Sequence, residues 1–209
     1  MYVQLNQDGT FWRQVRELRN FEWDASHFCP PEKLTVGESA YFRVYPLTLT
    51  TRPTTNAITQ GLREIDPIQV DGVWTQQWEV YELPAETAAA NLANAKLSAW
   101  AAIKAERDRR KAGGVLVSGK WFHSDVDSRI QQLGLVMMGA SVPSVQWKTM
   151  DGSFVTMSQA IANGIFQAAA ALDMSLFAVA EAHRLAMEAS ADPGGYDFSA
   201  NWPTHYAEA

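Results

Sequence analysis

The sequence predicts an α+β fold with a β-rich N-terminal part and a mixed C-terminal part. Asp-Gly pairs between apolar runs, at Asp71-Gly72 and Asp151-Gly152, are typical of hairpin turns. Apolar residues at helical spacing recur over about 84–111 and again after Ser158. The 209 residues, 47% apolar and 19% charged, are enough to bury a core. We therefore expect a β-rich N-terminal domain over 1–83, a connecting helix over 84–112, and an α+β C-terminal domain over 113–209.

The N-terminal domain is predicted to consist of strands and loops. Strands are expected over residues 2–5, 11–15, 41–45, 68–70 and 73–83. Asp8-Gly9 and Asp71-Gly72 suit the hairpin turns between neighbouring strands. The segment 48–60 has many hydroxyl side chains and few apolar ones, so it is expected to be an exposed loop.

The connecting part is predicted to be one helix. Pro84 suits its first turn, and basic residues crowd its last turns, where the helix dipole is negative. Its apolar stripe consists of Leu92, Ala95, Ala99 and Ile103. Because alanine dominates this stripe, another helix can approach closely. Two arrangements are open, namely a parallel homotrimer around the stripe and packing within the same chain.

The C-terminal domain is predicted to begin with a hairpin over 115–122 and to contain a second over 145–157. Between them, Ser124 with Asp127 three residues later resembles a capping box. This pattern predicts a helix that runs through Met138.

A long helix is predicted after Ser158. Its apolar residues keep a spacing of 3.6 straight through Asp173, which favours one helix of about 30 residues over two shorter ones. Asp192-Pro193-Gly194-Gly195 is a stop signal.

Charge and cysteine content disfavour several classes of partner. The net charge of −6 argues against nucleic acid, whose phosphates require clustered Lys and Arg. A single cysteine, Cys29, excludes an intramolecular disulfide. No segment is expected to be apolar enough to cross a bilayer, and the N-terminus lacks the pattern of a signal peptide. We therefore expect synthesis in the cytoplasm and no membrane partner.

No residue pattern predicts a catalytic, cofactor-binding or metal site. His123, Asp125 and Asp127 alternate, and such a set could hold a divalent ion. The favoured interpretation is that Ser124 and Asp127 cap the following helix, while Asp125 interacts favourably with the positive end of its dipole. Cys29 would need a positioned base to act as a nucleophile.

Two other polar features are interpreted as structural. His183 lies on the apolar face of the long helix and is expected to be buried and hydrogen-bonded. The charged run 106–111 is expected to be a solvated end of the connecting helix, matched to its dipole.

An ordered set of motifs runs through the C-terminal half. They are Glu106-Arg107-Asp108-Arg109-Arg110, Gly113-Gly114, Gly119-x-x-Phe122-x-Ser124-Asp125, Ser128-Arg129 and Trp147-Lys148-Thr149-x-Asp151-Gly152-x-x-Val155-x-Met157, followed by an alanine-rich helix. In this order, over about Lys104 to Trp202, they resemble an uncharacterised domain family of tailed phages. That domain occurs at the ends of tail-fibre proteins and in small proteins encoded beside tail-fibre and baseplate genes.

The resemblance implies a structural component of a bacteriophage tail, located in the virion after synthesis in the host cytoplasm. Its partners would be tail-fibre or baseplate proteins, reached through protein–protein contacts. A tail-fibre assembly chaperone, absent from the mature virion, is the alternative. The family supplies no catalytic residues, and an enzyme acting on host surface polymers is a third hypothesis that no motif supports.

Large apolar side chains are the candidate contact residues for such partners. The candidates are Trp12, Trp23, Trp74, Trp202, Leu92 and Ile103. Exposed tryptophans in edge hairpins or in a tail would be costly without a partner. The alternative is that the four tryptophans belong to the core.

Overall fold

The computed structural model describes residues 1–208 except 7, 17–20, 25–26, 30–36 and 39–42, and for 21–24, 27–29, 37–38 and 43 only the backbone. The chain divides into two compact units, Met1–Asn91 and Leu92–Ala209. The boundary falls inside helix α1 (Ala85–Lys111), most of which belongs to the C-terminal unit. The predicted α+β fold class is confirmed.

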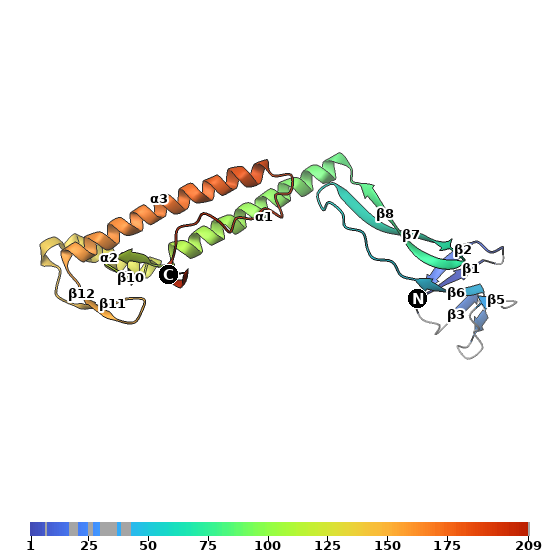
Figure 1. Cartoon of the computed structure of the whole chain (residues 1–209), viewed down its shortest axis with the longest axis horizontal. Coiled ribbons are helices and arrows are strands. Elements are labelled where there is room, and N and C mark those ends of the chain that lie inside the picture. The colour runs from blue at the N-terminus through green and yellow to red at the C-terminus, as the bar shows by residue number, and fades with distance from the viewer. Residues whose placement is uncertain (7, 17–20, 25–26, 30–36, 39–42, 209) are drawn as a thin grey trace. The chain divides into compact units, whose positions relative to one another are not determined.

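Within the described residues, the N-terminal unit contains one mixed sheet of six strands and a separate hairpin (Figure 1). The sheet strands are β1 (Tyr2–Leu5), β2 (Phe11–Val15), β5 (Gly37–Glu38), β6 (Arg43–Thr48), β7 (Gln60–Val70) and β8 (Val73–Glu82). Their order is β2-β1-β6-β8-β7, with β5 also paired to β6, and β6 runs parallel to β8 while the other pairs are antiparallel. The hairpin pairs β3 (Phe21–Asp24) with β4 (His27–Cys29).

The hairpin of β7 and β8 forms at the predicted Asp71-Gly72 turn. Both residues have positive φ, 51° and 80°, which is the conformation of a type I′ turn. β7 begins at Gln60, so the predicted start of this strand at Ile68 is wrong. The error arises at Pro67, which lies in a bulge between Ile65 and Ile68, because pairing with β8 resumes beyond the bulge.

Strand β6 also differs from its prediction. It continues through Pro46 to Thr48, where the sequence predicts an end at Tyr45. Pro46 has no N–H to donate, but the next residue, Leu47, donates its N–H to the Met1 carbonyl and then pairs with β8. Tyr41 lies outside the described residues.

The C-terminal unit contains the predicted hairpins and helices. Its elements after α1 are β9 (Val115–Val117), β10 (Lys120–Phe122), α2 (Val126–Met138), η2 (Gly139–Ser141), β11 (Gln146–Lys148), β12 (Phe154–Thr156), α3 (Gln159–Ala189) and η3 (Tyr206–Glu208). The two hairpins are β9 with β10 and β11 with β12. The unbroken α3 of 31 residues confirms the prediction of a single long helix.

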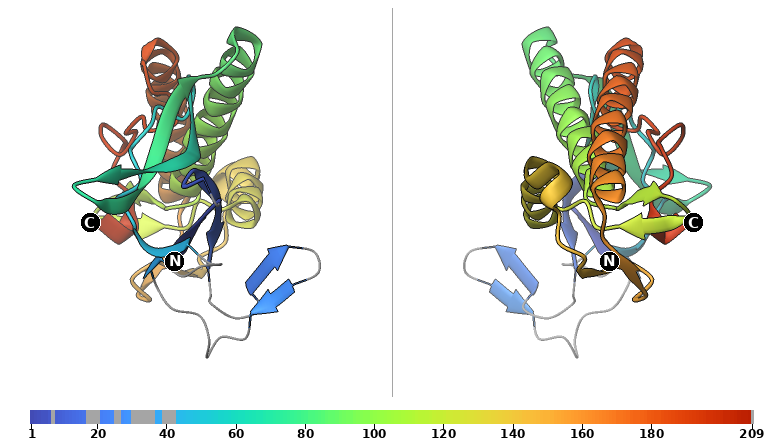
Figure 2. Two further views of the ribbon diagram at one scale, coloured as in Figure 1. Left: turned by 90° about the vertical axis from the view of Figure 1, so that its right-hand side faces the viewer. Right: turned by 90° about the vertical axis from the view of Figure 1, so that its left-hand side faces the viewer.

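Two apolar clusters hold this unit together. The larger joins α3 to both hairpins and α2, with Phe122 and Ile165 among its buried residues. The smaller joins α1 to α3, which run side by side in Figures 1 and 2, through Ile103, Ala180 and Met187. Ile103 is wholly buried in this cluster, so the C-terminal end of the α1 stripe packs within the same chain.

Helix α2 is capped by a residue other than the predicted one. Asp125 is the N-cap, and its carboxylate accepts hydrogen bonds from the backbone N–H and the hydroxyl of Ser128. Ser124 is instead buried, where its Oγ accepts from Gly114 N and donates to the Lys111 carbonyl. The predicted capping box of Ser124 and Asp127 is therefore wrong by one residue, because the Ser124 hydroxyl is engaged with the chain at the end of α1, at Lys111 and Gly114.

Among the described helices, α3 alone is long and apolar enough to cross a membrane by length and composition. The sequence-based expectation that no segment reaches this level is therefore wrong. A mostly buried core helix passes the same test, but only 22% of the apolar window of α3 is buried, although α3 places Ile165, Leu176 and Ala180 in the core of its unit.

Candidate functional site

The C-terminal segment after α3 returns along α1 and ends in η3 (Figure 1). The stop signal predicted at Asp192-Pro193-Gly194-Gly195 follows the end of α3, and Pro193 is buried. At its far end the segment is tied to the end of α1 by a hydrogen bond of 3.0 Å from Tyr206 N to the Gly113 carbonyl. This segment, 190–208, is called the C-terminal strap below.

His183 is the first anchor of the strap. Its Nε2 lies 2.9 Å from the Ala200 carbonyl, so Nε2 carries the donated proton. Its Nδ1 lies 2.9 Å from the Tyr196 hydroxyl, and the Trp202 ring lies beside the imidazole at 5.3 Å between centroids. The prediction of a buried, hydrogen-bonded histidine is confirmed.

Arg110 is the second anchor. Its side chain is buried, and it donates to Glu106 Oε1 (2.6 Å), the Pro203 carbonyl (3.0 Å) and both carboxylate oxygens of Glu208 (2.9 and 3.1 Å). The prediction that 106–111 is a solvated helix end is therefore wrong for Arg110, because the strap covers it.

Arg109 extends the same network. It donates to both carboxylate oxygens of Glu106 and to Nε2 of His205, at 2.7 Å each. Since a guanidinium only donates, Nε2 of His205 accepts, and the ring proton lies on the buried Nδ1, which is 3.1 Å from Glu208 Oε2 but makes no hydrogen bond to a described residue.

The arginines fix the ionisation of the carboxyl groups around them. Hydrogen bonds from Arg109 first, and from Arg110, lower the pKa of Glu106 to about 2 against the cost of burial. A hydrogen bond from Arg110 is the main cause that lowers the pKa of Glu208. Both carboxylates are therefore ionised near neutral pH, whereas a general acid needs a pKa near the working pH.

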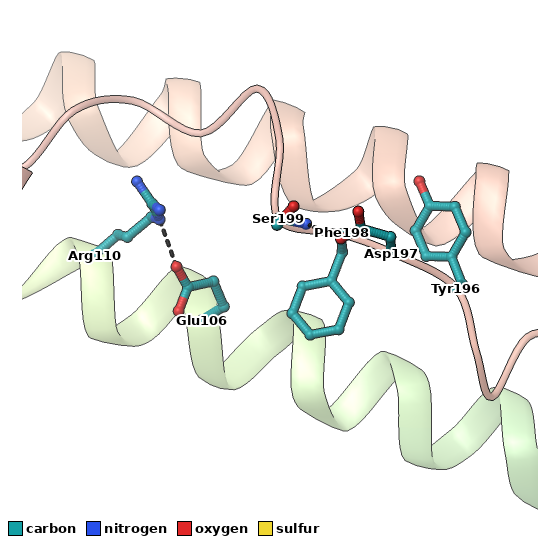
Figure 3. A pocket seen from close by; sticks show the side chains of 6 residues that line it. All are labelled: Glu106, Arg110, Tyr196, Asp197, Phe198 and Ser199. Atoms are coloured by element: carbon teal, nitrogen blue, oxygen red, sulfur yellow. Dashed lines mark hydrogen bonds and ion pairs between the residues drawn. The ribbon is translucent and has the colours of Figure 1, made fainter.

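A shallow pocket of about 250 Å³ lies between α1 and the strap (Figure 3). Its lining residues are Glu106, Arg110, Tyr196, Asp197, Phe198 and Ser199. The Asp197 carboxylate accepts the backbone N–H of Ser199, which is the main cause that lowers the pKa of Asp197. Of the charged groups at this pocket, Arg110 thus bonds across to the strap, whereas Glu106 bonds within α1 and Asp197 within the strap.

The predicted metal candidates take other roles. Asp125 caps α2, while His123 and Asp127 are exposed. In the part of the chain that the structure describes, no three His, Cys, Asp or Glu side chains come together as metal ligands. The side chain of Cys29 lies outside the described residues.

The predicted contact residues have different environments. Trp12 is exposed, and the guanidinium of Arg13 lies over its ring at 4.6 Å. Trp74 is half-buried, and neither its indole N–H nor that of Trp78 has a hydrogen-bond partner among the described residues. Leu92 is half-buried on α1.

Two of the predicted contact residues pack within the chain, and the side chain of a third is not described. Ile103 is buried against α3, and Trp202 packs on the same cluster while its Nε1 donates to the Phe198 carbonyl at 2.6 Å. These two side chains therefore serve the internal packing of the C-terminal unit. The side chain of Trp23 lies outside the described residues.

Sequence reasoning missed the strap as an ordered element. The available signal was the spacing of Tyr196, Phe198, Trp202 and Tyr206 in an otherwise polar tail. That spacing matches no regular helix or strand, because contacts with the rest of the C-terminal unit set the positions of these side chains.

The C-terminal unit is thus an α+β domain in which a strap ties two neighbouring helices together. Residues 94–200 match the family described as Domain of unknown function (DUF4376), so the chain belongs to that family. The expected membership of an uncharacterised domain family in the C-terminal half is confirmed, and the association with tail fibres stays a prediction. Comparisons with curated proteins and with solved structures found no match.

Proposed function

We propose that the protein is a structural component of a bacteriophage tail that acts by contacts with tail-fibre or baseplate proteins. The phage assignment is supported by the ordered motifs between Lys104 and Trp202, which resemble a tail-fibre-associated domain. The mode of action is supported by the surface of the C-terminal unit.

The observation that carries the proposal is a set of large apolar side chains left exposed on helices α2 and α3. They include Ile130 and Met137 on α2 and Met174 and Phe177 on α3. Large apolar side chains exposed together on neighbouring helices favour an interaction site in a folded protein. A structural subunit needs such surface, because neighbouring chains bury it on assembly.

Quantitative mass spectrometry of purified virions tests the proposal. We expect the chain at a fixed copy number relative to the fibre and baseplate proteins, with a host cytoplasmic protein as the control for contamination. Absence from the particle, together with recovery of a complex with fibre chains from infected cells, would overturn the proposal in favour of the assembly chaperone.

A further inference from the structure

The exposed apolar residues of α2 and α3 form two stripes. On α2, Val126, Ile130, Leu133 and Met137 follow helical spacing and are 43–80% exposed. On α3, the stripe consists of Phe166, Met174 and Phe177, which are 47–71% exposed. These seven side chains are called the α2–α3 face.

An ion pair places both stripes on the same side of the C-terminal unit. Arg129 of α2 donates to the two carboxylate oxygens of Asp173 of α3 at 2.7 and 3.0 Å. Around the axis of α2, Arg129 lies between the apolar stripe and the buried Gln132. Around the axis of α3, Asp173 likewise lies between the stripe and the buried Leu176. Since the two charged residues meet at the seam between the helices, the stripes flank that seam on its outer side.

The α2–α3 face carries no unpaired charge at its centre. Asp173 is half-buried and neutralised by Arg129 and by Lys111, whose Nζ lies 3.4 Å away. A surface that meets its own copy across a two-fold axis must avoid opposing like charges. The face satisfies this condition.

The size of the α2–α3 face matches one side of a stable dimer. Taking the two phenylalanines at about 150–250 Å² and the aliphatic residues at the lower end of that range, the observed exposures give at most on the order of 800 Å² of apolar surface that a partner can bury. The largest apolar patch on a typical monomer is about 300–600 Å², whereas each partner contributes about 800 Å² to a standard interface.

We propose that the α2–α3 face is a self-association interface, covered in solution by the same face of a second copy of this chain. The inference rests on the proposed function in taking protein contact as the role of this surface, and it identifies the neighbouring chain at this face as a second copy. Contacts of the dimer with tail-fibre or baseplate proteins would then lie outside the α2–α3 face. Helices from the two copies would pack their apolar stripes together, in the way that antiparallel helix pairs do within one domain.

The net charge of −6 disfavours an anionic lipid surface as the occupant of the face. The charges beside the face are of both signs: Asp127 flanks the α2 stripe, and Glu181 and Glu188, beyond the α3 stripe, are both paired with Arg184. Interfacial helices instead carry mainly Lys and Arg beside their apolar face.

Sedimentation of the full chain tests the proposal. We expect twice the monomer mass of 23.2 kDa within about 1–100 µM of protein. Met174→Glu, at a position 71% exposed in the single chain, is expected to weaken dimerisation about 100-fold or more, because it buries a charge in the interface. Its helical circular dichroism should stay unchanged.

Leu116→Glu is the matched control. Leu116 is 53% exposed and lines a groove with Ala171 and Leu172, on the flank of α3 opposite Asp173. This variant should dimerise as the unchanged chain does. If Leu116→Glu dissociates the dimer and Met174→Glu does not, the interface lies at that groove, and the proposal is overturned.

A footprint on the unchanged chain provides a second measurement. Dimerisation should protect Met137 and Met174 from peroxide oxidation as concentration rises, while Met1 in the N-terminal unit keeps a constant rate. A chain that remains monomeric at about 100 µM, or one that associates with vesicles of phosphatidylcholine and phosphatidylglycerol through this face, would overturn the proposal.

The two proposals fail separately. A monomeric chain found at fixed copy number in virions would overturn self-association and leave the tail function standing. A dimer absent from virions would overturn the tail function and leave the α2–α3 face as a dimer interface.

Discussion

Arg110 makes interactions that its position in the sequence does not suggest. It stands in a run of charged residues at the end of a helix, where solvated side chains are the norm. The strap buries its guanidinium and supplies the Pro203 carbonyl and the Glu208 carboxylate as acceptors. A buried arginine with several acceptors is strongly coupled to each of them, so removal of one partner affects the others.

Glu106→Gln is expected to lower the free energy of unfolding near neutral pH by about 1–3 kcal/mol, because it breaks a partly buried ion pair. The pKa of Glu106 is depressed from 4.5 to about 2 in the folded state. Its stabilisation is therefore complete above about pH 4.5 and is lost as the pH falls toward 2. Urea unfolding at several pH values should show the two proteins converging across this interval.

Glu188→Gln is the control for that measurement. Glu188 is exposed and pairs with Arg184 on the surface of α3. Its substitution should change the free energy of unfolding by less than about 1 kcal/mol. Equal effects of the two substitutions would show that the strap contributes little to the environment of Glu106.

Tyr196→Phe is expected to destabilise the chain by about 1 kcal/mol, because it removes the hydroxyl that bonds to Nδ1 of the buried His183. Chemical denaturation followed by circular dichroism measures the change. Tyr81→Phe, at an exposed position in the N-terminal unit, provides the matched control and should be nearly neutral. A neutral Tyr196→Phe would mean that water replaces the hydroxyl at no cost.

At the scale of elements, local sequence signals placed the hairpins and helices of the C-terminal unit well, but in the N-terminal unit they missed the hairpin of β3 and β4 and the first eight residues of β7. The turns at Asp71-Gly72 and Ser118-Gly119 adopt positive φ at both residues, as two-residue hairpin turns require. The even 3.6-residue spacing correctly predicted α3 as one helix. The cap of α2 was misplaced because Ser124 and Asp125 are both good capping residues, and a tertiary hydrogen bond to the Lys111 carbonyl decides between them.

Two glycines of the C-terminal unit should respond to alanine in opposite directions. An added Cβ would meet nothing within 4 Å at either Gly119 or Gly134. Gly119 has φ of 77°, so Gly119→Ala should cost about 1 kcal/mol in backbone strain. Gly134 lies inside α2, so Gly134→Ala should stabilise by about 0.5–1 kcal/mol. Thermal unfolding of both variants checks the signs, and a shared sign would contradict the assigned turn.

At the scale of the whole molecule, α1 contributes to the C-terminal unit more than a connector would. Its Ile103 belongs to a buried cluster with α3, and its Arg110 anchors the strap. The apolar stripe of α1 predicted close helix packing, but alanine-rich stripes suit partners within and between chains equally. Only the position of α3 decided that Ile103 packs internally.

A fragment of residues 84–209 is therefore expected to unfold cooperatively, whereas a fragment of 113–209 should not. The shorter fragment would expose Ala180 and Met187 and would leave Glu208 without Arg110. Thermal unfolding by circular dichroism and the dispersion of amide NMR signals compare the two. Matching transitions in both fragments would show that α1 is dispensable to the C-terminal unit.

The sequence by itself determined the fold class, the hairpin turns, the length of α3 and the family of the C-terminal half, because each depends on local chemistry or on ordered motifs. Only the tertiary structure decided the strap, the burial of Arg110, the cap of α2 and the ion pair that joins α2 to α3. Those features depend on contacts between residues far apart in the chain, such as Arg129 with Asp173 and Arg110 with Glu208, which no periodicity of a single segment encodes.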